Sequence, residues 1–151
     1  MMSDIKEKLY QLCIAYVQNR MKASEEAIAG AQQAANDDTK SSAGDKYETG
    51  REMAQQETNR NLAQLNEANK LMVALNQLNI KSTSQTAEPG SVVITSNGNF
   101  YLSISAGILE LDGKSYFAVS PASPIGIKLK GLQEGNEFIL NGKNYKIQSI
   151  Q

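Results

Sequence analysis

The hydrophobic positions of the chain follow two different periods, one in residues 1–80 and another in residues 89–151. In the first stretch, apolar residues recur at steps of three and four, as from Ile5 to Leu9 and Cys13, which is typical of amphipathic helices. In the second stretch, short apolar runs alternate with glycine-containing turns, which is typical of strands. The pattern therefore predicts an α+β chain of two domains.

Two long helices are expected in the first stretch, from Ser3 to about Asn36 and from about Lys46 to Asn79. Their similar length and loose apolar stripes favour an antiparallel two-helix coiled coil. Residues 36–46, with Asp-Asp, Ser-Ser and a glycine, are expected to form the turn at its tip. Beyond Met21 the stripe of the first helix thins to alanine, so the tip end of the pair is expected to be its least stable part. Lys6 is assigned to the polar face of this helix, and Leu62 to the apolar stripe of the second.

Residues 81–88 are polar and are interpreted as a linker. The domain that follows, residues 89–151, is expected to contain six short strands joined partly by hairpins at Asn97-Gly98, Asp112-Gly113 and Asn141-Gly142. The predicted strands are Ser91–Ser96, Phe100–Ser105, Gly107–Leu111, Tyr116–Val119, Glu137–Leu140 and Asn144–Ile150.

A short helix is expected between the fourth and fifth strands. Ser123 is its predicted N-cap, Pro124 its first residue and Gly131 its stop. The candidate core of this domain is Phe100, Leu102, Ile104, Phe117, Val119, Ile125, Leu129, Phe138, Leu140 and Ile147.

Composition restricts the chemistry that the chain can perform. It contains no histidine and one cysteine, Cys13, which excludes histidine-based triads, Cys–His pairs, histidine-ligated metals and an internal disulfide. The net charge of −1 gives no global basic field for nucleic-acid binding. The first residues include no apolar signal-peptide core, and no apolar run is long enough to span a bilayer, so a cytoplasmic chain without membrane contact is expected.

Two regions of the chain resemble one known family. The run Gly-Asp-Lys-Tyr-Glu-Thr-Gly-Arg-Glu at residues 44–52 resembles the acidic tip and second helix of the GreA/GreB transcript cleavage factors of bacteria. The run Val-Ser-Pro-Ala-Ser-Pro-Ile-Gly at residues 119–126, with Asn-Gly-Lys-Asn-Tyr-Lys-Ile at 141–147, is similar to the C-terminal domain of that family. Residues 89–93 also resemble the start of that domain.

The resemblance implies an N-terminal antiparallel coiled coil and a C-terminal FKBP-like domain. It implies that the globular domain docks on RNA polymerase, with Ser123, Pro124, Ile125 and Gly126 as the candidate contacts. It also implies that the coiled coil enters the secondary channel, where acidic tip residues help to hold a catalytic Mg²⁺ near the 3′ end of backtracked RNA. The candidate ligands are Asp37, Asp38, Asp45 and Glu48, with Asp38 and Asp45 preferred.

On this interpretation the polymerase remains the enzyme, and the chain acts on it as a monomer without catalytic residues of its own. The tip departs from the family pattern, because Asp45 stands two residues before Tyr47 where the family has a small residue. Two alternatives stay open for the chain: a Gre-like inhibitor that enters the channel without promoting cleavage, and a coiled-coil adaptor unrelated to polymerase. For the tip carboxylates, the alternative is that they only belong to a solvated turn and cap a helix.

Overall fold

The computed structural model describes the backbone of residues 2–39, 44–78, 80–81 and 84–151, and the side chains of residues 5–34, 50–78, 80–81 and 84–151. The chain divides into two compact units. One, the sheet unit, comprises Met1–Tyr16 and Val73–Gln151; the other, the helical unit, comprises Val17–Met72. The predicted domain boundaries stay a prediction.

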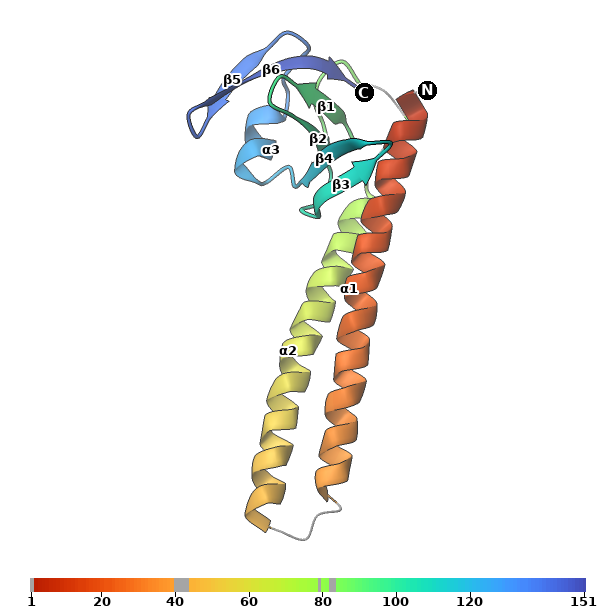
Figure 1. The fold of residues 1–151 in the computed structure, drawn as a ribbon, viewed down its shortest axis with the longest axis vertical. Coiled ribbons are helices and arrows are strands. Elements are labelled where there is room, and N and C mark those ends of the chain that lie inside the picture. Colours follow the sequence, from red (N-terminus) through yellow and green to blue (C-terminus); the bar gives the residue numbers. More distant parts are fainter. Residues whose placement is uncertain (1, 40–43, 79, 82–83) are drawn as a thin grey trace. The chain divides into compact units, whose positions relative to one another are not determined.

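Both predicted long helices are present. Helix α1 spans Met2–Thr39 and helix α2 spans Gly44–Asn76, each within three residues of the expected ends. In the helical unit they lie side by side (Figure 1). They run antiparallel there, because Arg20 contacts Gln64 while Ala31, further along α1, shares a hollow with Ala54, an earlier residue of α2.

The helical unit buries few bulky side chains. Its buried residues in the described part are Val17, Ser24, Ala31 and Ala68. Leu62, which the sequence assigns to the apolar stripe of the second helix, is 43% exposed. A helix with only one neighbouring helix can cover a narrow strip of its surface, and side chains beside that strip stay in solvent.

The second half of the chain forms one mixed sheet, whose strands lie in the order β3-β4-β2-β1-β6-β5. All six predicted strands are present, with ends shifted by at most three residues. Strands β2 and β4 are parallel, and the other neighbours are antiparallel. The elements are β1 (Val92–Thr95), β2 (Gly98–Leu102), β3 (Gly107–Leu111), β4 (Lys114–Val119), α3 (Pro124–Leu129), β5 (Glu137–Leu140) and β6 (Lys143–Ile150).

Two of the three predicted hairpin turns are confirmed. Asp112 and Gly113 have φ of 51° and 77°, and Asn141 and Gly142 have φ of 52° and 79°, the left-handed pair that two-residue hairpins favour. The third turn is shifted by one residue, because Gly98 pairs with Thr95 and opens β2. The Thr95 hydroxyl stabilises this register, since it donates to the Gly98 carbonyl at 2.7 Å and accepts from Asn97 N at 3.2 Å.

One face of the sheet packs against α3. The core on this face contains Ala87, Val93, Phe100, Leu129 and Ile147, and an aromatic contact joins Phe100 to Tyr145 with ring centroids 6.0 Å apart. Ala87, which lies in the segment predicted as a linker, exchanges backbone hydrogen bonds with Leu132 and Gly131. Five core candidates are buried, namely Phe100, Leu102, Ile104, Leu129 and Ile147; four are half-buried, namely Val119, Ile125, Phe138 and Leu140.

The assignment of Phe117 to the core is wrong, because 38% of this residue is exposed. Its neighbours Tyr116 and Ala118 are buried instead. Strand residues alternate between the two faces of a sheet, and in β4 the opposite face is the better covered one. Buried Leu9 and Cys13 of α1 belong to the same unit, and the Cys13 thiol lies 3.7 Å from the Ser103 hydroxyl, next to β2.

Lys6 of α1 is also buried, with 3% exposure, so its assignment to the polar face is wrong. Burial lowers the pKa of its ammonium group, and the charge of Glu88 opposes that shift. The negative charge of Glu88 favours the charged form of Lys6 and so offsets part of the cost of burying it.

Candidate docking site on the sheet unit

The segment that begins α3 folds as predicted. Ser123 is the N-cap: its hydroxyl donates to the Ser120 carbonyl at 2.6 Å and accepts from Gly126 N at 3.1 Å. Pro124 occupies the first turn, where its missing N–H has no cost. Gly131 follows the helix with φ of 86°, the conformation that favours glycine at a helix end.

Gly126 is a packing residue. A Cβ added there would lie 2.0 Å from the Ser120 carbonyl oxygen, a separation that no side chain can adopt without backbone movement. Ile125 packs against the core, and Ser123 is engaged in the cap. Of the four predicted polymerase contacts, Pro124 is exposed, Ser123 and Ile125 are half-buried, and Gly126 is buried.

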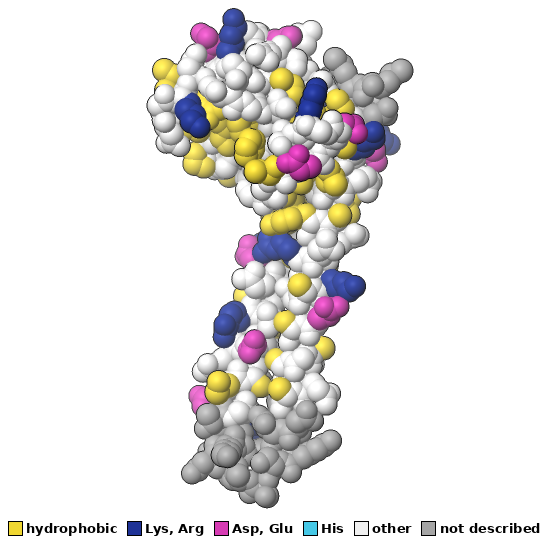
Figure 2. Space-filling view, in the orientation of Figure 1, with side chains coloured by type: hydrophobic (Ala, Val, Ile, Leu, Met, Phe, Trp, Pro, Cys, Tyr) yellow, Lys and Arg dark blue, Asp and Glu magenta, His cyan; other side chains and the backbone are white. Residues whose placement is uncertain are grey.

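Three exposed apolar residues of the sheet unit were missed as site candidates from the sequence. They are Ile127 on the outer side of α3, with 64% exposure, and Ile108 and Phe117 on neighbouring strands, with 57% and 38%. Figure 2 shows hydrophobic side chains on the surface of the sheet unit. The sequence of β4 contained a signal for this exposure. Tyr116 and Phe117 are consecutive, so they face opposite sides of the strand and one of the two must leave the better covered face.

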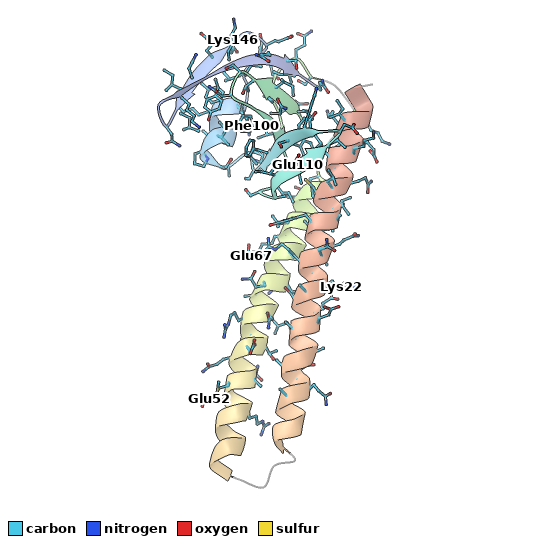
Figure 3. All side chains as sticks on the ribbon, viewed as in Figure 1. Lys22, Glu52, Glu67, Phe100, Glu110 and Lys146 are labelled. Atoms are coloured by element: carbon cyan, nitrogen blue, oxygen red, sulfur yellow. The ribbon has the colours of Figure 1, made fainter. Side chains whose placement is uncertain are left out.

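A carboxylate on β3 is held by a hydrogen bond beside these exposed apolar side chains. Glu110, labelled in Figure 3, is exposed on β3 and accepts a hydrogen bond from the Ser115 hydroxyl at 2.7 Å. Ser115 is its direct cross-strand partner. A carboxylate held beside exposed apolar side chains suits a partner surface that combines an apolar residue with a lysine or arginine.

The side chains of the predicted metal ligands lie outside the described part of the structure. Side chains are not described for residues 35–49, but the backbone places Asp37 and Asp38 in the last turn of α1 and Asp45 and Glu48 at the start of α2. Within the described part of the chain, no group of three or more acidic, cysteine or histidine side chains could hold a metal ion. The case for Mg²⁺ thus depends on the chemistry of the donors alone, since carboxylates are the hard oxygen ligands that Mg²⁺ prefers.

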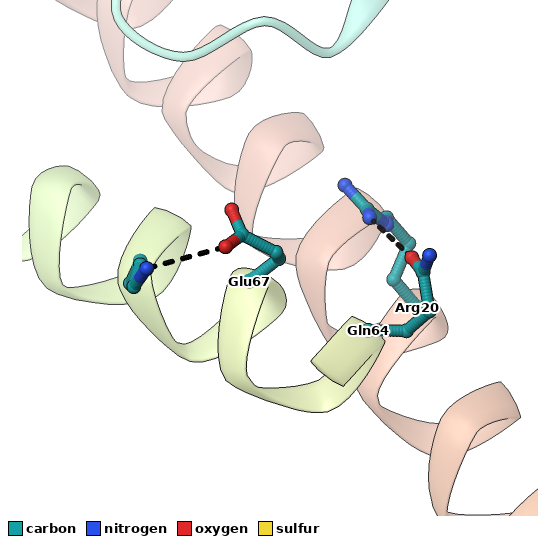
Figure 4. A network of polar contacts seen from close by, with 4 residues as sticks. Arg20, Gln64 and Glu67 are labelled. Atoms are coloured by element: carbon teal, nitrogen blue, oxygen red, sulfur yellow. Dashed lines mark hydrogen bonds and ion pairs between the residues drawn. The ribbon is translucent and has the colours of Figure 1, made fainter. Parts of the chain in front are cut away.

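The helical unit contains a hollow of about 340 Å³ between α1 and α2. It is lined by Ala31, Gln32, Arg51, Ala54, Gln55, Thr58 and Leu62. The two alanines in this lining are short side chains that border open space. Polar contacts elsewhere in this unit are exposed, namely Arg20 with Gln64 at 3.3 Å and Lys70 with Glu67 at 3.2 Å (Figure 4).

A buried polar cluster lies in the sheet unit. Tyr101 is fully buried, and its hydroxyl has no hydrogen-bond partner among the described residues. Burial raises the pKa of Tyr101, with smaller contributions from Cys13, Tyr10 and Glu7. Burial likewise raises the pKa of the Cys13 thiol, so the reactive thiolate is disfavoured and Cys13 is a packing residue.

In comparisons with protein-family models, curated proteins and solved structures, nothing matches this chain. Among the described residues, no helix combines the length and apolar character needed to cross a bilayer. The fold and the residues themselves are therefore the basis for assigning a function.

Proposed function

We propose that the chain is a Gre-like regulator of RNA polymerase that enters the secondary channel with the turn between α1 and α2 and stimulates cleavage of backtracked RNA. The main support is the Ser120–Gly126 segment, in which the residues of the family-like motif form a capped helix entry around Gly126. Further support comes from the order of elements, a long helix pair followed by a six-stranded sheet with one short helix. In this proposal the pair is a coiled coil and the sheet unit is FKBP-like.

The tip acids supply the proposed chemistry. Asp38 and Asp45, with Asp37 and Glu48 as second candidates, would complete the oxygen shell of a Mg²⁺ ion that the polymerase shares. The polymerase then cleaves its own transcript near the 3′ end, and the chain contributes ligands only. Such a factor acts in the cytoplasm as a monomer.

A second candidate function is inhibition of the polymerase through the same channel. The unusual spacing at the tip favours it, because Asp45 lies two residues before Tyr47, where the resembling family has a small residue. A protein that fills the channel without placing two carboxylates on one metal would slow nucleotide addition and leave backtracked RNA intact.

The deciding experiment uses a stalled, backtracked complex of the cognate polymerase. Wild-type protein is expected to shorten the RNA in a Mg²⁺-dependent manner, and Asp38→Ala/Asp45→Ala is expected to bind normally but to cleave at least about tenfold more slowly. The control is Glu52→Ala/Glu57→Ala, which removes the same charge from exposed positions of α2. Binding with slowed nucleotide addition and no cleavage would replace activation with inhibition, and absence of binding would leave the adaptor hypothesis.

A further inference from the structure

The α3 motif offers little surface to a partner. The Ser123 hydroxyl donates to the Ser120 carbonyl and accepts from Gly126 N, and a Cβ at Gly126 would clash with the Ser120 carbonyl oxygen. Ile125 packs into the core, which leaves Pro124. A single proline is too small to anchor a specific interface, whose affinity usually comes from a few well-buried apolar or aromatic side chains. If the sheet unit docks on polymerase, as the proposed function requires, its main contacts must lie elsewhere on the unit.

The best anchors are Ile108 and Phe117, which we name the β3–β4 patch. These residues are direct cross-strand partners, so their side chains lie together on one face of the sheet. Phe117 contacts Phe100 with ring centroids 5.7 Å apart, and Phe100 belongs to the same core as Leu129 of α3. The patch is therefore the exposed continuation of the core that α3 covers, on the same face of the sheet.

The surroundings of the patch indicate the chemistry of its partner. Glu110 lies two residues after Ile108 on β3, so it faces the same side at a distance of roughly 7 Å along the strand. Its hydrogen bond from Ser115 holds the carboxylate in place, and no ion pair of Glu110 is found in the described part of the chain. A complementary surface would place an apolar side chain on the patch and a cation beside Glu110.

We propose that Ile108 and Phe117 are the anchors through which the sheet unit binds RNA polymerase, and that Glu110 pairs with a lysine or arginine of the polymerase at their edge. This inference depends on the proposed function. The anchors proposed here differ from the contacts Ser123–Gly126 that the family resemblance implies. Residues Ser123–Gly126 form the start of α3, whereas side chains of β3 and β4 supply the binding energy.

The test is a binding titration of labelled full-length chain against the cognate polymerase. Ile108→Asp and Phe117→Ser are each expected to raise the Kd about tenfold or more, since each removes an apolar anchor. Glu110→Lys is expected to raise the Kd as well and to change its dependence on salt concentration. The matched control is Ile139→Asp: Ile139 is 66% exposed on β5, and it faces away from Phe138, whose ring stacks on Tyr145 at 4.9 Å.

Each variant is first checked for an unchanged circular dichroism spectrum. Because Phe117 also contacts Phe100, Ile108→Asp at the edge strand is the safer variant if Phe117→Ser proves misfolded. Wild-type affinity in Ile108→Asp and Glu110→Lys, or an equal loss in Ile139→Asp, would overturn the inference. Failure of the wild type to bind polymerase would overturn the proposed function and this inference with it, whereas binding without cleavage would overturn only the cleavage activity.

Discussion

The two ends of α1 are built differently although one helical period runs through both. Near its start, Leu9, Cys13 and Val17 follow at intervals of four residues and are fully buried. Further along, the most buried apolar residue in the described part of the helix is Ala31, with 9% exposure. A continuous periodic stripe therefore predicts a continuous helix, but it does not predict uniform burial along that helix.

The difference has an energetic consequence. Burying a leucine side chain contributes roughly 1.5–3 kcal/mol, whereas an alanine contributes much less. Isolated helices are marginal in water, and most of their stability in proteins comes from packing of the apolar face. The first turns of α1 are thus stabilised by bulky contacts within the sheet unit, and the helical unit depends more on intrinsic helix propensity.

The largest expected effect compares two leucines, one from each unit. Leu9→Ala should lower the free energy of unfolding by about 3 kcal/mol, because Leu9 is fully buried and the substitution leaves a cavity. Leu62→Ala makes the same chemical change at a residue with 43% exposure, and it should cost less than about 1 kcal/mol. Urea unfolding followed by circular dichroism measures both values, and equal losses would contradict the contrast between the units.

The second effect concerns the buried hydroxyl of Tyr101. A buried hydroxyl without a partner costs about 1–3 kcal/mol, so Tyr101→Phe should stabilise the sheet unit by about 1 kcal/mol at neutral pH. Tyr145→Phe is the matched control, because Tyr145 is only half-buried. Thermal unfolding of both variants measures the difference, and a loss of stability in Tyr101→Phe would reveal a hydrogen bond of that hydroxyl.

The same residue predicts a pH dependence. Burial raises the pKa of Tyr101, so at alkaline pH the phenol ionises in the unfolded chain while it stays neutral in the folded one. The free energy of unfolding should therefore fall as pH rises above about 10, the ordinary value for tyrosine. Tyr101→Phe should reduce this fall, and an unchanged alkaline slope in urea titrations would show that Tyr101 is not its source.

Much of the fold could be predicted from local patterns. The long helices followed from the three-and-four period, and the Asp112-Gly113 and Asn141-Gly142 turns followed from residues that adopt left-handed conformations readily. The Asn97-Gly98 turn was misplaced by one residue because the choice depends on the Thr95 hydroxyl, a contact that a dipeptide pattern does not encode.

Burial was harder to predict, because it depends on which elements cover which face. Phe117 was expected in the core on hydrophobicity alone, but β4 turns Tyr116 and Ala118 to its better covered face. Lys6 was expected in solvent, although it is buried in the sheet unit. The docking candidates show the same difference between local pattern and burial. The Ser123–Gly126 motif could be found from its residue pattern. The exposure of Ile108 and Phe117 could not, because it depends on sheet order and on the position of α3.

The smallest expected effect tests whether the helical unit depends on propensity. Gly30 lies within α1, and a Cβ added there would meet nothing within 4 Å, so Gly30→Ala should stabilise the helix by about 0.5–1 kcal/mol through reduced backbone freedom. Amide hydrogen exchange should slow around residue 30 and remain unchanged in the sheet unit. Gly126→Ala is the opposite control, because its Cβ would meet the Ser120 carbonyl and destabilise the sheet unit. If Gly30→Ala left exchange unchanged, intrinsic propensity would not limit the stability of this stretch, and contacts between α1 and α2 would have to hold it.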